Sequence, residues 1–137
     1  MNEEKLEISL PSRIESVEIA AAKASSFAAS LGFAEDQLFA IDMAVREVVA
    51  NAVRHGNKLD EEKAVEIAFS NSKEGFEVNV RDYGEGFAVE EVPDPTNPEN
   101  LLKASGRGIL FMRSFMDTVE WVKHKEGGTL VKMLKLR

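Results

Sequence analysis

The feature that most constrains the fold of this 137-residue chain is a helical segment that is apolar on nearly every side. Between Leu38 and Val53, 12 of the 16 residues are apolar. A helix at the surface of a domain keeps a polar face, so a helix that lacks one is expected to be covered from several directions. We therefore expect residues 35–55 to form a mostly buried helix that packs against other elements.

Four polar side chains interrupt this apolar segment. Asp42 and Arg46 are four residues apart and are expected to form an ion pair on the solvent side of the helix. Glu47 and Asn51 have the same spacing but lie on the next stripe of the helix, without such a partner. Burying an unpaired charge is costly. Either this end of the helix is partly exposed, or Glu47 and Asn51 line a site.

The segment before this helix predicts a strand and a second helix. Residues 6–11 alternate between apolar and polar and end at a proline, as a short strand does. Residues 12–31 carry an apolar stripe at helical spacing. Ser12 with Glu15 three residues later matches a capping box, and Gly32 stands where a helix C-terminal glycine is expected.

The segments after residue 60 predict two hairpins separated by a long loop. Residues 64–72 and 75–84 alternate with period two, and residues 118–137 form a second pair of strands that turns at Gly127–Gly128. The loop or lid at 87–105 holds three of the four prolines, and a helix is expected after Gly108. This order predicts a single α+β domain over residues 1–137. Its architecture is a two-layer sandwich with a mixed, mostly antiparallel sheet and helices on one face.

Composition narrows the classes of function. The net charge of -7 argues against direct nucleic-acid binding, which needs a basic surface to displace counterions. No apolar run approaches the roughly 18–20 residues of a membrane span, and the acidic N-terminus does not resemble a secretory signal. Without cysteine, the chain has no disulfide framework and no thiolate nucleophile or metal ligand. We expect a cytoplasmic protein with no membrane association.

Two glycine motifs are candidate ligand sites. "DYGEG" (82–86) places an acid at a predicted strand end, followed by two glycines that would let a ligand approach the backbone. It is also compatible with a polar turn. "GRG" (106–108) at the start of a predicted helix could present backbone N–H groups to a phosphate, or could be a flexible loop end. Neither motif is a dinucleotide fingerprint or a P-loop.

The segment "EVVANAVRHG" (47–56) carries the third candidate motif. The side-chain oxygen of Asn51 is a hard ligand of the kind that suits Mg²⁺. Glu47, one helical turn earlier, could take a proton from a nucleophile. The alternative is a helix whose polar edge reaches the surface. Each motif alone leaves its purely structural interpretation open.

Taken together and in this order, the motifs resemble the GHKL ATPase superfamily. Its ATP site combines a helix box that ends in Asn, a D-x-G-x-G box, a mobile lid and a second glycine box. The resemblance covers about residues 36–130 and implies the histidine-kinase-like ATPase fold, with the ATP lid at about 87–105. The segments "NAVRHGN", "RDYGEGF" and "SGRGILFMRSFMDTVEW" are most similar to the small anti-sigma factor serine/threonine kinases. Those proteins bind a sigma factor and phosphorylate a serine of an anti-anti-sigma (STAS-type) partner.

The resemblance implies a role for individual residues. Asn51 would ligate Mg²⁺, and Glu47 would contact the nucleotide site as the general base. Asp82 would accept a hydrogen bond from the adenine amino group, a contact that discriminates strongly against other bases. The remaining implied contacts to ATP are Arg54, His55, Gly84, Gly86, Phe87, Ser105, Gly106, Arg107, Gly108, Ile109 and Thr129.

One departure from the family pattern leaves two functions open. Ala104 stands where family members often carry an arginine that contacts the terminal phosphate, and Lys103 or Arg107 is the alternative source of that charge. The leading hypothesis is an anti-sigma factor that is also an ATP-dependent protein serine kinase. The second is a nucleotide-gated module that sequesters its partner without appreciable kinase activity.

A third hypothesis, the catalytic domain of a sensor histidine kinase, is disfavoured because no dimerisation helix with a phospho-accepting histidine precedes the ATP motifs. The resemblance also implies a possible homodimer. The first helix or the N-terminal edge strand would then form the contact between the two copies.

Overall fold

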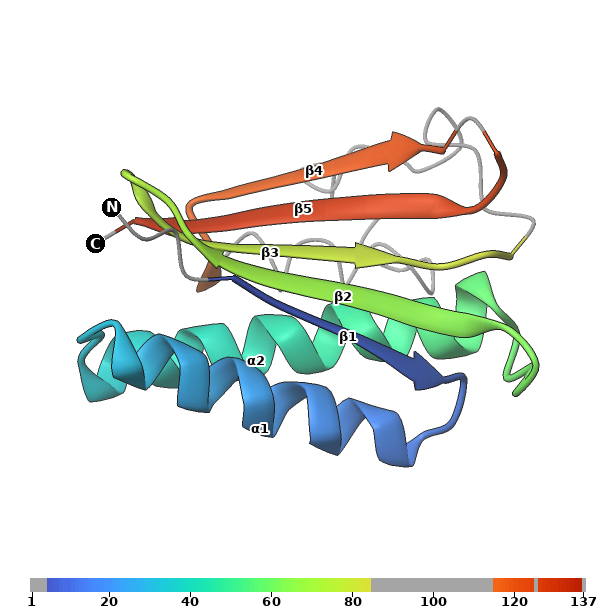
Figure 1. Cartoon of the computed structure of the whole chain (residues 1–137), viewed down its shortest axis with the longest axis horizontal. Coiled ribbons are helices and arrows are strands. Elements are labelled where there is room, and N and C mark those ends of the chain that lie inside the picture. The colour runs from blue at the N-terminus through green and yellow to red at the C-terminus, as the bar shows by residue number, and fades with distance from the viewer. Residues whose placement is uncertain (1–4, 85–114, 125, 137) are drawn as a thin grey trace, which may run out of the picture.

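Five strands and two α-helices make up the part of the chain that the computed structural model describes, residues 5–84, 115–124 and 126–136 (Figure 1). In chain order the elements are β1 (Lys5–Pro11), α1 (Glu15–Ser30), α2 (Glu35–Asn51), the π-helical turn η1 (Ala52–Gly56), β2 (Ala64–Asn71), β3 (Gly75–Arg81), β4 (Thr118–Lys123) and β5 (Thr129–Leu136). The predicted lid and the helix predicted after Gly108 lie outside the described residues, apart from a helical Phe115. The assignment of one domain to residues 1–137 stays a prediction.

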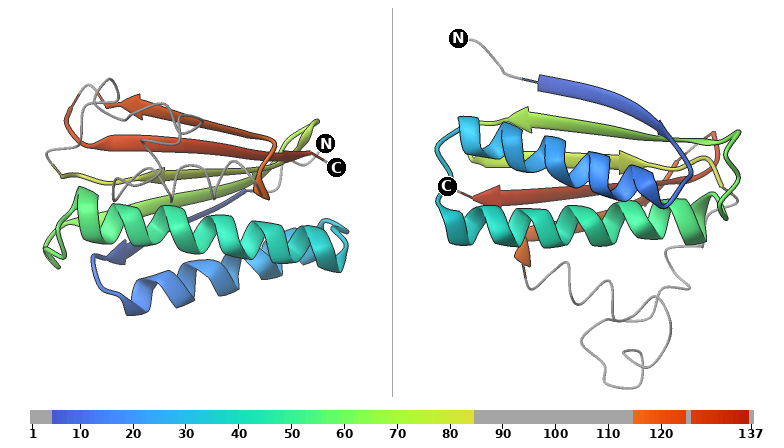
Figure 2. Two further views of the ribbon diagram at one scale, coloured as in Figure 1. Left: turned by 180° about the vertical axis from the view of Figure 1, so that it is seen from behind. Right: turned by 90° about the horizontal axis from the view of Figure 1, so that it is seen from below.

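The strands form one sheet in the order β1-β2-β3-β5-β4. All four pairings between neighbouring strands are antiparallel. Helices α1 and α2 lie side by side on one face of this sheet (Figure 2). The predicted α+β sandwich is confirmed. The described strands contain no parallel pair, although the prediction of a mixed sheet had allowed for one.

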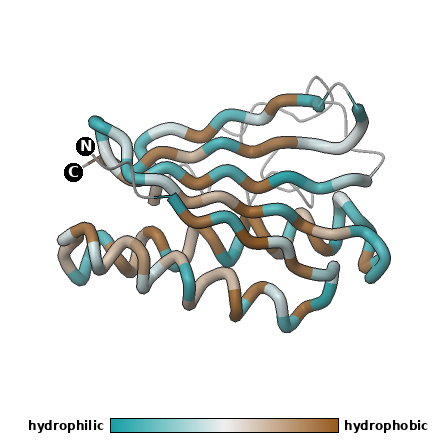
Figure 3. The backbone as a smooth tube through the Cα atoms, viewed as in Figure 1, coloured by the Kyte–Doolittle hydropathy of each residue, from teal (hydrophilic) through white to brown (hydrophobic). Residues whose placement is uncertain are grey.

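The core lies between the helix pair and the sheet. Its largest fully buried side chains include Ile41 of α2 with Phe69 and Phe76 of the β2–β3 hairpin. The rings of Phe69 and Phe76 are stacked with centroids 5.9 Å apart. Apolar and polar residues alternate along the strands, as Figure 3 shows by colour. Each large apolar side chain contributes about 1.5–3 kcal/mol when buried, so this face holds the two layers together.

Helix α2 is mostly buried, as its composition predicts, but its C-terminal end differs from the prediction. The α-helix ends at Asn51, and Ala52–Gly56 form the π-helical turn. The Asn57 N–H donates to the Ala52 carbonyl oxygen over 2.8 Å and closes this wider turn. Short π-helical turns are rare and are often found at functional sites.

The predicted pair between Asp42 and Arg46 is confirmed, with the Arg46 Nε donating to an Asp42 oxygen over 2.9 Å. Arg46 also forms an ion pair with Glu18 of α1. Its hydrogen bond and charge hold the pKa of Glu18 below the ordinary value. Arg46 therefore links α2 to α1 through Glu18, and links two turns of α2 through Asp42.

The predicted capping box at the start of α1 is wrong. The helix begins at Glu15, and no side chain caps it. Ser12 is almost fully buried, and its hydroxyl donates to the Lys63 carbonyl oxygen over 2.6 Å. It also accepts a hydrogen bond from Asn57, so contacts distant in sequence take up the group that the local pattern assigns to the cap. The predicted C-terminal glycine is confirmed, because Gly32 has a φ of +92°.

The two predicted hairpins are confirmed, with shorter strands than expected. Strand β3 ends at Arg81, so residues 82–84 follow the strand. Gly127 and Gly128 have φ values of +98° and +85° and form the turn between β4 and β5. Among the described helices, none combines the length and the apolarity needed to cross a bilayer.

Candidate functional site

Asp82 follows β3 directly and is 5% exposed. Its Oδ1 accepts hydrogen bonds from the backbone N–H groups of Gly84, over 3.1 Å, and of Thr129, over 3.3 Å. Its own N–H donates to the Thr129 carbonyl oxygen over 3.0 Å. The end of β3 and the start of β5 thus fix both the backbone and one carboxylate oxygen of Asp82.

Burial raises the pKa of Asp82 above its ordinary value, because the charged form loses contact with water. The hydrogen bonds from Gly84 and Thr129 oppose this rise in pKa, and so do the charges of Arg81 and Lys63. Both backbone donors contact Oδ1. No described group donates to Oδ2, so with respect to the described residues this oxygen keeps its capacity to accept a hydrogen bond.

Three glycines surround Asp82 at distances that exclude a side chain. A Cβ on Gly56 would lie 2.4 Å from the Asp82 Cγ, and one on Gly128 would lie 2.0 Å from the Asp82 carbonyl oxygen. A Cβ on Gly84 would lie 1.6 Å from the Gly56 carbonyl oxygen. The end of η1, the segment after β3 and the β4–β5 turn therefore meet at Asp82, where Gly56 faces the side chain and Gly128 faces the backbone carbonyl. We call these three glycines with Asp82 the aspartate cage.

Thr129 places a second polar group at the cage. Thr129 is 2% exposed, and its hydroxyl oxygen is buried without a hydrogen-bond partner among the described residues. A buried polar group without a partner costs about 1–3 kcal/mol, so its position calls for an explanation. The Thr129 N–H binds the Asp82 carboxylate, so Thr129 adjoins the cage. Among the described residues, the Thr129 hydroxyl and Asp82 Oδ2 both keep unused hydrogen-bonding capacity there.

Asn57 is a buried residue of the site that the sequence analysis missed. It is 1% exposed, and its Oδ1 accepts from the Tyr83 N–H over 2.8 Å. Its Nδ2 donates to the Ser12 hydroxyl over 2.8 Å and to the Ala64 carbonyl oxygen over 3.0 Å. A polar residue after a glycine is typical of an exposed turn, so the only signal was its place at the end of "NAVRHGN".

The other predicted residues within the described part lie on α2 and η1. Glu47 and Asn51 are half-buried, one helical turn or about 6 Å apart along the axis. Neither side chain forms a hydrogen bond or ion pair with another described residue. Arg54 and His55 are exposed on η1, the turn whose last residue, Gly56, packs against Asp82. The helix motif and "DYG" are therefore brought into contact.

The remaining predicted residues lie outside the described residues. They are Gly86, Phe87, Ser105, Gly106, Arg107, Gly108 and Ile109, together with Ala104 and Lys103. Their assignment to the nucleotide site stays a prediction.

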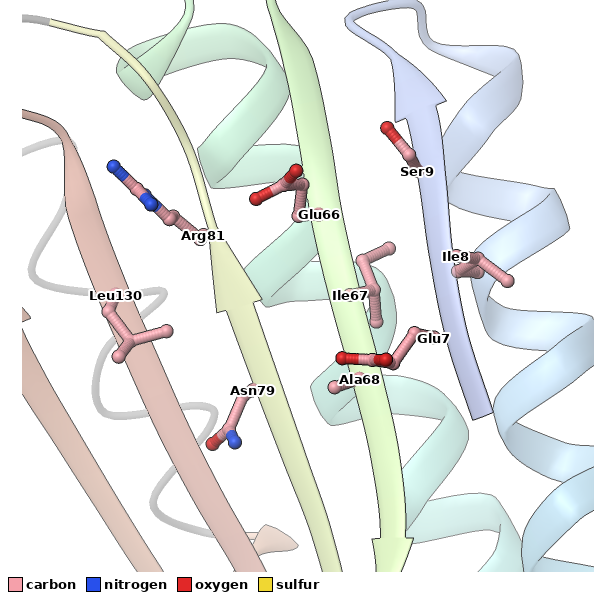
Figure 4. A pocket seen from close by; sticks show the side chains of 9 residues that line it. All are labelled: Glu7, Ile8, Ser9, Glu66, Ile67, Ala68, Asn79, Arg81 and Leu130. Atoms are coloured by element: carbon pink, nitrogen blue, oxygen red, sulfur yellow. The ribbon is translucent and has the colours of Figure 1, made fainter. Parts of the chain in front are cut away.

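A separate hollow of about 440 Å³ lies on the sheet face opposite the helices (Figure 4). Glu66, Asn79 and Arg81 line it together with residues of β1 and β5. The Arg81 guanidinium stacks over the Tyr83 ring at 4.2 Å, and the Tyr83 hydroxyl donates to Glu66. None of the predicted site residues lines this hollow. We therefore place the candidate site at the aspartate cage.

Comparisons with known proteins match nearly the whole chain. The family described as "Histidine kinase-like ATPase domain" matches residues 10–135. The chain is 32% identical to an anti-sigma F factor of Heyndrickxia coagulans, over 96% of this chain and 91% of that protein. It is 34% identical to an anti-sigma F factor of Clostridium perfringens, over 96% of this chain and 95% of that protein. It is 29% identical to the serine-protein kinase RsbW of Bacillus subtilis, over 98% and 86%.

A solved structure shows the same fold. The crystal structure of the RsbU and RsbW domains of Rv1364c from Mycobacterium tuberculosis superposes with a TM-score of 0.70 at 20% identity. The alignment covers 97% of this chain and 32% of that longer chain, so the present chain spans about a third of it. With the family match and the relatives above 30% identity, the chain belongs to the histidine kinase-like ATPases, in the group of the anti-sigma factor serine kinases.

Proposed function

We propose that this chain is an anti-sigma factor and an ATP-dependent protein serine kinase. It sequesters a sigma factor and phosphorylates a serine of a STAS-type anti-anti-sigma partner. The observation that carries the proposal is the aspartate cage, with one carboxylate oxygen fixed by backbone donors and the other available to a ligand. The names of the relatives, anti-sigma F factor and serine-protein kinase, support the same function.

The cage suits the edge of an adenine ring. Asp82 Oδ2 would accept a hydrogen bond from the 6-amino group, and the buried Thr129 hydroxyl would form a further hydrogen bond at the same edge. A base with a 6-oxo group would place an oxygen against the carboxylate and leave Asp82 without its donor. Sites built in this way discriminate strongly, because the wrong ligand leaves a buried polar group unpaired.

The phosphates would extend from the cage towards α2 and η1. Asn51 offers a side-chain oxygen to Mg²⁺, a hard cation that binds nucleotide phosphates with few protein ligands. The bound ion would neutralise charge on the phosphate oxygens. Arg54 and His55 are exposed on the adjoining turn and would add positive charge on a protein whose net charge is -7.

Glu47 would act as the general base of the transfer. It is half-buried one turn before Asn51 and has no partner in the described part of the chain. As the partner's serine oxygen forms its bond to the γ-phosphorus, Glu47 takes the serine proton. The bond from the γ-phosphorus to the bridging oxygen breaks, and ADP leaves. A positioned base typically contributes about 10²–10⁴-fold to such a step.

The test is incubation with γ-labelled ATP, Mg²⁺ and a purified STAS-type protein from the same organism. The proposal predicts labelled phosphoserine on the partner. Glu47→Gln should lower the rate by about 10²-fold or more while nucleotide binding persists. The matched control is Asp42→Asn, the same change on the same helix at a residue that pairs with Arg46. Equal rates in both variants would contradict the role of Glu47.

Ala104 favours a second candidate function, a nucleotide-gated switch without appreciable kinase activity. A stable complex with the partner but no label would support the switch and overturn the kinase.

Because the proposed partners act on transcription, we place the protein in the cytoplasm. A homodimer through α1 or the edge strand β1 is also part of the proposal, and sedimentation of the purified chain tests it.

A further inference from the structure

Asn57 holds the backbone segment that carries Asp82. Its Oδ1 accepts a hydrogen bond from the Tyr83 N–H over 2.8 Å. Tyr83 lies between Asp82 and Gly84, the two cage residues that follow β3. Asp82 Oδ1 in turn accepts from the Gly84 N–H over 3.1 Å. The peptide between Asp82 and Tyr83 is therefore fixed by Asn57, and the carboxylate by the peptide that follows.

The hydrogen-bond network allows one orientation of the Asn57 amide. The Ser12 hydroxyl donates its single proton to the Lys63 carbonyl oxygen over 2.6 Å. It can therefore only accept from Asn57, so the amide nitrogen must face Ser12 and the oxygen must face Tyr83. The second amide hydrogen is donated to the Ala64 carbonyl oxygen over 3.0 Å. All groups of this buried amide are used, and a flipped amide would lose every one of these contacts.

Asn57 also follows Gly56, the glycine that contacts the Asp82 side chain. One residue thus fixes the position of the 82–84 segment relative to the turn that closes on it. Among the described residues, Asn57 forms no hydrogen bond with the side chains of Glu47, Asn51, Arg54 or His55, to which proton transfer, the metal and the phosphates are assigned. Its described link to the proposed site is through the segment that carries Asp82.

We propose that Asn57 is a positioning residue that sets adenine selectivity. The inference rests on the proposed function, in which Asp82 Oδ2 accepts from the adenine amino group. Without Asn57, the 82–84 segment loses its anchor and Oδ2 no longer holds the direction of that hydrogen bond. The contact with the 6-amino group weakens, whereas binding through the phosphates does not depend on this contact.

The test measures the dissociation constants of ADP and IDP, with Mg²⁺, on the full chain by titration calorimetry. IDP carries a 6-oxo group in place of the amino group. The wild type should strongly prefer ADP, since a correctly placed buried acceptor rejects a base that lacks the donor. Asn57→Ala should lower this ratio at least tenfold, mainly through weaker ADP binding. The matched control is Asn79→Ala, on the sheet face opposite the helices, which should leave the ratio unchanged.

A milder variant covers the case in which Asn57→Ala does not fold. Ser12→Ala removes one acceptor of the Asn57 amide and leaves its bonds to Tyr83 and Ala64, so a severalfold fall of the ratio is expected. The inference is overturned if folded variants keep the wild-type ratio, or if ADP and IDP binding fall equally. A wild type that binds neither nucleotide, or both alike, overturns the proposed function instead.

Discussion

At the scale of residues, Asp82 is organised by backbone groups from three segments that are distant in sequence. Gly56, Gly84 and Gly128 approach so closely that none of them has room for a Cβ. Among the described residues, the carboxylate accepts hydrogen bonds only from backbone N–H groups. A small acceptor site of this kind depends on glycine positions that the pattern of charged residues does not indicate.

Adjacent glycines in the β4–β5 turn separate the effect of this close contact from backbone strain. Gly127 and Gly128 both have positive φ values, so alanine at either should cost about 1–2 kcal/mol of unfolding free energy. Only Gly128→Ala also places a Cβ 2.0 Å from the Asp82 carbonyl oxygen. Gly128→Ala should therefore lower the unfolding free energy by about 1–3 kcal/mol more than Gly127→Ala, and it should also weaken ADP binding. Urea unfolding measures the unfolding free energy, and titration calorimetry measures the ADP affinity. Equal losses of unfolding free energy and of affinity in the two variants would contradict the cage.

The raised pKa of Asp82 predicts a pH dependence of stability. Because burial raises the folded-state pKa above the unfolded value, the folded protein binds the proton more tightly. Asp82 therefore favours folding most below its unfolded pKa, and this contribution is lost as pH rises through the folded pKa. The unfolding free energy of wild type minus Asp82→Asn should fall as pH rises through this window. A difference that is constant or rises with pH would contradict the burial of the charge.

At the scale of elements, the π-helical turn sets the direction of the chain after α2. The Ala52 carbonyl oxygen accepts from Asn57, five residues on, instead of four as in an α-helix. One extra residue per turn changes the angular position of the following side chains by about 100°. Lys58 and Leu59 then adopt positive φ values of 52° and 60°. These local departures bring Gly56 and Asn57 to Asp82 while Asn51 stays on the helix.

The C-terminus of α1 gives a prediction about an element boundary. Gly32 has a φ of +92°, and a Cβ added there would meet no atom within 4 Å, so only backbone strain opposes a side chain. Gly32→Ala should lower the unfolding free energy by about 1 kcal/mol, and Gly32→Asn by less, since asparagine tolerates this region. Urea unfolding of both variants tests this. Equal costs would indicate that the left-handed conformation does not terminate α1.

At the scale of the whole molecule, hydrophobic periodicity in the sequence is sufficient to predict the architecture. The apolar helix, the two hairpins and the glycine turn at Gly127–Gly128 are confirmed, because each depends on local pattern and on burial of one face. The Ser12 cap was wrong, since its hydroxyl binds Lys63 and Asn57, which are distant in sequence. The roles of Gly56, Gly128 and Asn57 arise from contacts between segments, which a single sequence does not encode as a pattern.

Binding of Mg-ADP to the wild type and to Asp82→Asn, measured by titration calorimetry, tests the central claim most directly. The backbone donors at Oδ1 oblige an asparagine to keep its oxygen there, so its NH₂ would face the adenine amino group. We expect saturable binding to one site in the wild type. The variant should bind at least tenfold more weakly, a loss of about 1.4 kcal/mol. Absence of binding to the wild type, or equal affinity in the variant, would contradict an adenine nucleotide site at the aspartate cage.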